Sequence, residues 1–150
     1  MIKILGLDIS SKSTGYALLD DGKLVKKFCG TISCRDVGPV SNLYCYCAEL
    51  EALLEKIYRT TSIDYIIIEE TYFSRNVKTL KTLCYFAGAT ISICHKLTMA
   101  EINFMTVGEV RKLVGTKDKE DTFNFITSKY KLDWDFDKDN DKTDAIANAL

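Results

Sequence analysis

The 150-residue sequence contains one proline, one histidine and no long hydrophobic segment. Its single proline, Pro39, forms no proline-rich linker, so we expect one domain over residues 1–150. Its single histidine, His95, argues against a site with several imidazole ligands and leaves no choice of base for a Ser-His catalytic pair. No apolar stretch approaches the ~20 residues of a membrane-spanning helix, so we expect no membrane partner.

The six cysteines lack a recognisable pattern. They include no Cys-x-x-Cys pair and no zinc-ligand spacing, and they occupy positions 29, 34, 45, 47, 84 and 94. Several fall at apolar-periodic positions, where cysteine packs as a small hydrophobic residue. Because the N-terminus also shows no signal peptide, we expect reduced thiols and a cytoplasmic protein, in a bacterium or a phage-infected host.

Composition and charge are those of an ordinary globular domain. Hydrophobic residues make up 47% and charged residues 27%, and the net charge is −1. Such a net charge provides no strong general attraction to nucleic acid. However, six aspartates and three lysines lie between residues 130 and 144, so the remainder of the chain is mildly basic. A phosphate-binding surface is therefore compatible with the sequence.

The hydrophobic pattern predicts an α/β fold. Apolar segments indicate strands at residues 2–9, 15–19, 24–32, 64–69 and 102–107, and the turn Asp20-Asp21-Gly22 joins the second strand to the third as a hairpin. Helical spacing predicts helices at residues 39–58, 77–96, 107–114, 118–130 and 141–150. This order predicts a mixed five-stranded sheet, three antiparallel strands and then parallel strands, flanked by helices.

Four carboxylates occur at positions that indicate a shared site. Asp8 and Glu69 each end a strand of bulky aliphatic residues, and ligand sites of α/β sheets lie beyond such strand ends. Asp141 and Asp144 are three residues apart and therefore share one face of a helix. Four clustered carboxylates repel one another unless a divalent cation such as Mg²⁺ or Mn²⁺ neutralises them. Two such ions would activate water and stabilise a leaving oxygen in phosphodiester hydrolysis.

Each carboxylate also has a structural interpretation. Asp8 could accept hydrogen bonds from the turn at residues 11–14, and Glu69 could be an ordinary charge at a strand end. Asp141 and Asp144 could be first-turn acids that interact favourably with the helix dipole.

The acidic run at residues 133–144 resembles a calcium-binding loop. Lys138 stands where that loop requires glycine, and Asp144 stands where it requires glutamate. We therefore expect a solvated acidic loop that leads into the last helix.

Three segments resemble motifs of a known family. ILGLDISSKSTGYALLD at residues 4–20 is similar to the opening motif of the RuvC family of Holliday-junction resolvases, in the RNase H-like superfamily. IIIEETYFSRN at residues 66–76 resembles the second motif of the family, and DKTDAIANAL at residues 141–150 resembles its closing motif. The resemblance implies an RNase H-like fold. It also implies a metal-dependent endonuclease that resolves Holliday junctions or other branched DNA by paired phosphodiester hydrolysis.

The resemblance also implies roles for individual residues. The metal ligands would be Asp8, Glu69, Asp141 and Asp144, with Glu70 as a rival to Glu69. Lys119 resembles a lysine near the scissile phosphate, with Lys117 as its rival, and Tyr72 matches an aromatic residue that contacts bases at the crossover. The basic residues that we expect to contact DNA phosphates are Lys12, Arg75, Lys78, Lys81 and Lys117, although a solvated helix face is the alternative for those at 75–81.

The helix at residues 77–96 is the expected interface of a homodimer. A four-way junction needs two nicks on opposed strands, and one domain of this size provides one site. The helix has apolar residues on one stripe at Leu80, Leu83, Ala87, Ile91 and Cys94, and off that stripe at Tyr85, Phe86, Ala89 and Ile93. One side would face the sheet and the other a second copy, unless the helix at residues 39–58 covers it within the monomer.

Other functions are weighed against this one. Sugar-kinase, actin and heat-shock-type ATPases have a similar opening Asp-x-Gly loop, but this chain lacks their second Gly-rich loop. A RuvC-like pre-16S rRNA maturation nuclease would share the fold, and a non-catalytic junction-binding module would not need four acids. Ile9-Ser10 replaces the Pro-Gly of many cellular RuvC proteins, and the sequence ends six residues after Asp144, which fits either a compact phage or viral relative or a trimmed C-terminal tail.

Overall fold

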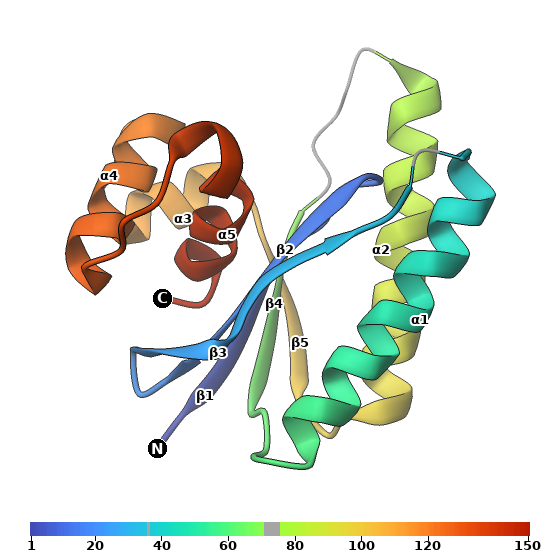
Figure 1. Cartoon of the computed structure of the whole chain (residues 1–150), viewed down its shortest axis with the longest axis horizontal. Coiled ribbons are helices and arrows are strands. Elements are labelled where there is room, and N and C mark those ends of the chain that lie inside the picture. Colours follow the sequence, from blue (N-terminus) through green and yellow to red (C-terminus); the bar gives the residue numbers. More distant parts are fainter. Residues whose placement is uncertain (36, 71–75) are drawn as a thin grey trace.

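The computed structural model describes residues 1–35, 37–70 and 76–150, in which a mixed sheet lies between two layers of helices (Figure 1). The strands are β1 (Lys3–Asp8), β2 (Ser13–Asp20), β3 (Lys23–Ser33), β4 (Tyr65–Glu69) and β5 (Glu101–Met105). The helices are α1 (Pro39–Tyr58), α2 (Val77–Leu97), α3 (Val107–Val114), α4 (Lys119–Tyr130) and α5 (Phe136–Asn148). In the order β3-β2-β1-β4-β5, the first three strands are antiparallel, and β4 and β5 run parallel to β1. The predicted sheet is confirmed.

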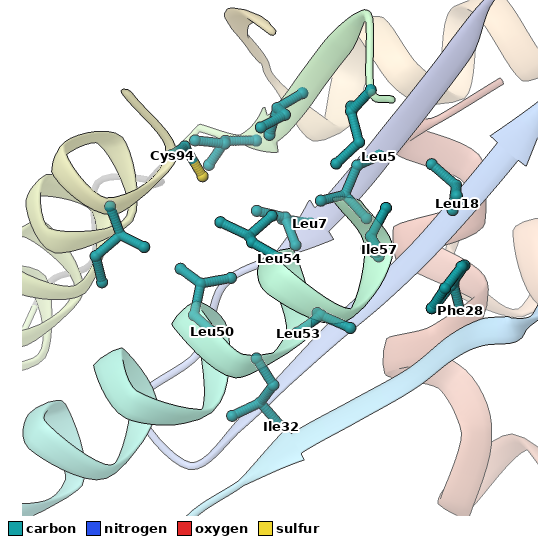
Figure 2. Packing of buried hydrophobic residues seen from close by; sticks show 14 of the residues in the cluster. Leu5, Leu7, Leu18, Phe28, Ile32, Leu50, Leu53, Leu54, Ile57 and Cys94 are labelled. Carbon is teal, nitrogen blue, oxygen red and sulfur yellow. The ribbon is translucent and has the colours of Figure 1, made fainter. Parts of the chain in front are cut away.

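The two faces of the sheet are covered by different helices, with α1 and α2 on one side and α3, α4 and α5 on the other (Figure 1). Side chains alternate between the faces along each strand. Leu5, Leu7 and Leu18 face α1, where they pack with Leu50 and Ile57 (Figure 2). Ala17 and Leu19 point the other way, into a second cluster with α5. Because both faces are buried, the middle residues of β1 and β4 are continuously apolar.

Helix α2 packs differently from the expected stripe. Its fully buried residues are Phe86, Thr90, Ile93 and Cys94, whereas Ile91 is 39% exposed. The Phe86 ring lies 5.0 Å from the ring of Tyr46 on α1, and the Thr90 hydroxyl lies 2.6 Å from the Tyr46 hydroxyl. Helix α1 therefore covers part of α2 within the monomer. The expected stripe is confirmed at Cys94 and wrong at Ile91. Thr90, a polar residue with its hydrogen bonds satisfied, occupies the core instead, and apolar spacing cannot indicate that.

Helix α5 begins at Phe136 rather than at Asp141. Asp135 caps it by accepting a hydrogen bond from the Asp137 amide (3.1 Å), and Asp139 accepts one from the Asp135 amide (2.9 Å). Much of the acidic run therefore caps and forms a helix instead of a solvated loop. Asp141 is consequently in the body of α5, and the interpretation of Asp141 and Asp144 as first-turn acids is wrong.

No helix in the described parts of the chain is long and apolar enough to cross a membrane.

Candidate active site

Strand register places Asp8 and Glu69 at the same edge of the sheet. Strands β1 and β4 are parallel neighbours, and Leu7 pairs with Ile68 in their register. Asp8 and Glu69 are each the next residue along, at the carboxyl ends of their strands, and both side chains are half-buried. Glu70 is exposed, so the structure brings Glu69 and not Glu70 toward Asp8.

Two glycines allow helix α5 to lie directly against the sheet beside these strand ends. A Cβ atom on Gly6 would lie 2.0 Å from the backbone oxygen of Ala145, and one on Gly15 would lie 2.0 Å from that of Asp141. Gly15 pairs with Asp8 inside β2, so it serves close approach of the helix and not a reversal of the chain. This contact brings the face with Asp141 and Asp144 to the ends of β1 and β4.

The carboxylates form one electrostatic cluster. Burial, followed by the charges of Glu69, Asp144 and Asp141, raises the pKa of Asp8 to about 8. Burial and the charge of Asp144 raise the pKa of Glu69 to about 7. The pKa of Asp144 is also raised, chiefly by burial. Without a bound cation, the site therefore retains protons near neutral pH because full ionisation is unfavourable.

Lys119 provides a positive charge within the cluster. Its ammonium nitrogen lies 2.9 Å from Oδ2 of Asp144. Burial lowers the pKa of Lys119, but the hydrogen bond to Asp144 and the charges of the acids outweigh burial, so the pKa is raised and the ammonium stays protonated. Lys119 is the first residue of α4, whose cap is Asp118. Lys117 is exposed, and its backbone amide bonds to Asp121 (2.8 Å), so of the two rivals the structure places Lys119 at the acids.

Sequence reasoning missed two further residues that interact with the cluster. Arg111 of α3 lowers the pKa of both Glu69 and Asp144 through its charge. Asn148 is buried on α5, donates a hydrogen bond to the backbone oxygen of Leu7 (3.1 Å) and lowers the pKa of Glu69 through a side-chain hydrogen bond. Asn148 lies one helical turn after Asp144, which is a usable signal, whereas no spacing in the sequence relates Arg111 to the acids.

The donor set of the cluster fits a hard divalent cation. Within the described residues, no three acidic, histidine or cysteine side chains already lie close enough together to hold a metal ion. The four carboxylates nevertheless supply oxygen donors alone, the type that Mg²⁺ prefers. Their mutual repulsion, seen in the raised pKa values of Asp8 and Glu69, is the interaction that a bound cation would relieve.

The expected DNA-contacting residues are placed in part. Lys12 and Lys78 are exposed and line one cavity of about 200 Å³ between the loop after β1 and the first turns of α1 and α2. Lys81 is exposed on α2. Tyr72 and Arg75 lie outside the described residues.

A mixed sheet of this order, with carboxylates at the ends of two strands and on a helix packed across them, is an RNase H-like fold. The family model for crossover junction endodeoxyribonuclease RuvC matches residues 4–150, and the chain belongs to the RuvC family. Membership implies dependence on a divalent metal and confirms the family resemblance of the three motifs.

Individual relatives agree with this assignment. Crossover junction endodeoxyribonuclease RuvC of Campylobacter jejuni serotype O:2 is 33% identical over 154 residues, covering 99% of this chain and 92% of the relative. The Campylobacter concisus protein of the same name is 30% identical, with 99% and 94% covered.

Solved structures show the same fold. Thermus thermophilus RuvC in complex with a Holliday junction substrate superposes with a TM-score of 0.80 at 14% identity, covering 99% of this chain and 90% of that one. The yeast mitochondrial Holliday junction resolvase Ydc2 superposes with a TM-score of 0.58 at 11% identity, covering 97% and 75%.

Proposed function

We propose that this protein is a metal-dependent endonuclease that resolves four-way DNA junctions by hydrolysing one phosphodiester bond in each of two opposed strands. The supporting observation is the carboxylate cluster formed by β1, β4 and α5, in which the charges of Glu69, Asp144 and Asp141 raise the pKa of Asp8 and the charge of Asp144 raises the pKa of Glu69. A protein that bound junctions without cutting them would gain nothing from this unfavourable arrangement of charge.

In this proposal the metal ligands are Asp8, Glu69, Asp141 and Asp144. Two Mg²⁺ or Mn²⁺ ions, when bound, would supply an activated water and stabilise charge on the leaving oxygen. Lys119 stays protonated and donates a hydrogen bond to a phosphate oxygen once the acids are neutralised. The hydrogen bond of Asn148 to Glu69 favours the ionised form of this carboxylate and orients it.

Phosphate contacts come from exposed lysines around the site, namely Lys12, Lys78, Lys81 and Lys117, together with Arg75. Tyr72 stacks on a base at the crossover. These side chains would bind the backbone of any branched DNA, and the junction's shape rather than its sequence would supply most of the affinity.

We further propose a homodimer that pairs two such sites by two-fold symmetry. Helix α2 leaves Tyr85 61% and Ile91 39% exposed, and these are large apolar side chains that a second copy could cover. Phe86 is 1% exposed and belongs to the core, so Phe86→Glu would unfold the monomer. Tyr85→Glu is the better test, because we expect a folded monomer that does not make paired nicks. Sedimentation that shows wild-type monomers with and without junction would contradict the dimer.

The natural setting follows from the proposed substrate. A junction-cutting enzyme works where DNA recombines, and the six cysteines are free thiols, as in a reducing compartment. We therefore propose that the protein acts in the cytoplasm as a single nuclease domain over residues 1–150.

The decisive experiment compares a labelled four-way junction, a linear duplex of the same sequence and a structured RNA, each with Mg²⁺, Mn²⁺ or EDTA. We expect symmetric nicks in the junction alone, dependent on metal. Asp8→Asn and Glu69→Gln should abolish cleavage and retain junction binding, whereas Glu70→Gln, the exposed neighbour, should cut like wild type. Preferential cleavage of the RNA would favour a pre-rRNA maturation nuclease of the same fold instead.

A further inference from the structure

A second cavity, of about 380 Å³, lies between β3 and the segment that joins α4 to α5. Lys26 lines it from β3, and Lys131 and Trp134 line it from the joining segment. The Tyr130 hydroxyl donates a hydrogen bond to the backbone oxygen of Gly22 (2.8 Å), which holds the end of α4 against the hairpin between β2 and β3. The two walls of the cavity are therefore fixed to each other.

One end of this cavity is close to the carboxylate cluster. Lys142 directly follows Asp141 on α5, and its side chain lines the cavity. Its ammonium group forms an ion pair with Asp139 and lies 4.6 Å from the centroid of the Trp134 ring. The side of α5 next to the predicted metal ligand Asp141 therefore forms part of the cavity wall.

The other end of the cavity is further from the acids along the sheet. Gly15 of β2 pairs with Asp8, whereas Leu19, four residues later, pairs with Leu24, which lines the cavity. At ~3.3 Å per residue of a strand, this separation is about 13 Å. The cavity therefore extends from beside the carboxylate cluster to about 13 Å away from it.

The lining of the cavity is positively charged. Lysines at positions 26, 131 and 142 line it, against one acid, Asp133. Lys142 is neutralised by Asp139. Lys26 and Lys131 are exposed, and within residues 1–35, 37–70 and 76–150 neither forms an ion pair. Two lysines on opposite walls therefore provide positive charge that a bound anion would neutralise.

The position of these lysines matches the spacing of phosphates in DNA. The cavity with Lys12 and Lys78 lies by the first turns of α1 and α2, whereas Leu24 and Trp134 pack against the core cluster on the α5 face of the sheet. One strand of B-DNA carries a phosphate about every 3.4 Å along its axis, so about 13 Å corresponds to about four nucleotides. An arm with one phosphate at the acids can therefore place another at this cavity.

We propose that this cavity is a second phosphate-binding site, in which Lys26 and Lys131 hold the backbone of one duplex arm about four nucleotides from the scissile phosphate. The inference rests on the proposed nuclease function. Lysine presents a mobile point charge that contacts phosphate and reads no base, so this site positions the arm and does not select its sequence. Because it lies away from the acids, it contributes to binding of the junction and not to the chemical step.

The first test maps the contact on the DNA. Wild-type protein with Mg²⁺ identifies the cut position in a four-way junction. Junctions are then made with one methylphosphonate, which removes the charge of a single phosphate, at each position up to about eight nucleotides from the cut, and binding is measured in EDTA. We expect affinity to fall by about 1.4- to 5-fold, the range for one exposed ion pair, at one or two positions about three to six nucleotides from the cut.

The second test uses the double variant Lys26→Gln/Lys131→Gln, which should fold because both side chains are exposed. We expect the slope of log K against log salt to decrease by about 2, and the methylphosphonate penalty to disappear at the mapped positions and nowhere else. Lys56→Gln/Lys96→Gln removes the same charge from exposed positions on α1 and α2, and should keep both the slope and the penalty. At saturating protein, both variants should cut the junction at the wild-type rate.

The outcomes separate this site from the nuclease function. A junction that is cut but shows no methylphosphonate penalty, or an unchanged salt slope in the folded Lys26→Gln/Lys131→Gln variant, would overturn the arm-binding site and leave the nuclease function intact. Penalties that persist in this variant would place the contact on another surface and would also overturn the assignment. No cleavage of any junction with Mg²⁺ or Mn²⁺ would overturn the nuclease function itself, and the arm contact with it.

Discussion

Replacing Asp8 by asparagine should stabilise the metal-free protein while abolishing cleavage. The pKa of Asp8 is raised from 3.8 to about 8, so the folded protein binds this proton more tightly than the unfolded chain does. As pH rises from about 4 toward about 8, the unfolded chain therefore releases the proton first, and the folded protein loses stability across that range. Asparagine has no proton to release, so the loss should not occur in the variant.

The size of the effect follows from the same values. Between the ordinary pKa of 3.8 and pH 7 there are 3.2 pH units. At about 1.36 kcal/mol per unit, the folded protein loses at most about 4 kcal/mol of stability through Asp8. Water penetration and relaxation of the side chains reduce such penalties, so we expect a net stabilisation of about 1–3 kcal/mol. For a chain of 150 residues this corresponds to a rise in Tm of about 2–12 °C.

Thermal unfolding followed by circular dichroism tests this prediction at pH 4.5, 6 and 8, in EDTA and in Mg²⁺. We expect the advantage of Asp8→Asn to be small at pH 4.5 and largest at pH 8 in EDTA. Mg²⁺ should raise the Tm of wild type and leave Asp8→Asn nearly unchanged, because the variant lacks a ligand. A variant less stable than wild type in EDTA at pH 8, or an advantage that does not vary with pH, would refute the account of the cluster.

Three other predictions concern the helix contact, the lysine and the DNA surface. Gly15→Ala should destabilise the protein by about 1–3 kcal/mol and reduce cleavage, because its Cβ would meet the Asp141 backbone at 2.0 Å. Gly88→Ala, where the new Cβ would meet open space on α2, should instead stabilise the protein by about 0.5–1 kcal/mol. Chemical denaturation measures both changes, and equal effects would contradict the contact of Gly15 with α5. Lys119→Met should lose most cleavage and keep junction binding in gel-shift assays, whereas Lys117→Met should cut bound junction at the wild-type rate and only weaken binding; the reverse pattern would make Lys117 the functional lysine. Junction affinity should fall steeply with salt, and Lys78→Gln should reduce the slope of log K against log salt by about 1, so an unchanged slope would remove Lys78 from the phosphate contacts.

The sequence by itself determined the strands and the identity of the strand-end acids. Apolar runs that end in Asp8 and Glu69 can be read directly, because a strand buried on both faces must be apolar throughout and a charge marks where it emerges. The hairpin at Asp21 and Gly22 was equally local, since both residues adopt positive φ there, 46° and 72°. Family motifs in the right order then related these elements to a nuclease.

Only the tertiary structure shows which of two neighbouring candidate residues lies in the site. Glu69 and Glu70 are adjacent and equally acidic, but strand pairing with β1 and burial under α5 select Glu69. Lys119 was distinguished from Lys117 by the packing of α4 on α5, which places one ammonium 2.9 Å from Asp144. Such selections depend on contacts between segments far apart in the chain, and residue type alone does not specify them.

Long-range contacts also decided which residues of α2 are buried and which further residues belong to the site. The Tyr46 hydroxyl satisfies Thr90 in the core, so a polar residue is buried where apolar spacing placed Ile91. Arg111 reaches the acids from α3 because the sheet, α3 and α5 meet there, and no local pattern encodes that meeting. The sequence therefore determined which acids end the strands, and the packing of α5 on Gly6 and Gly15 determined that they form one site, because the absence of two Cβ atoms lets a helix backbone touch the sheet.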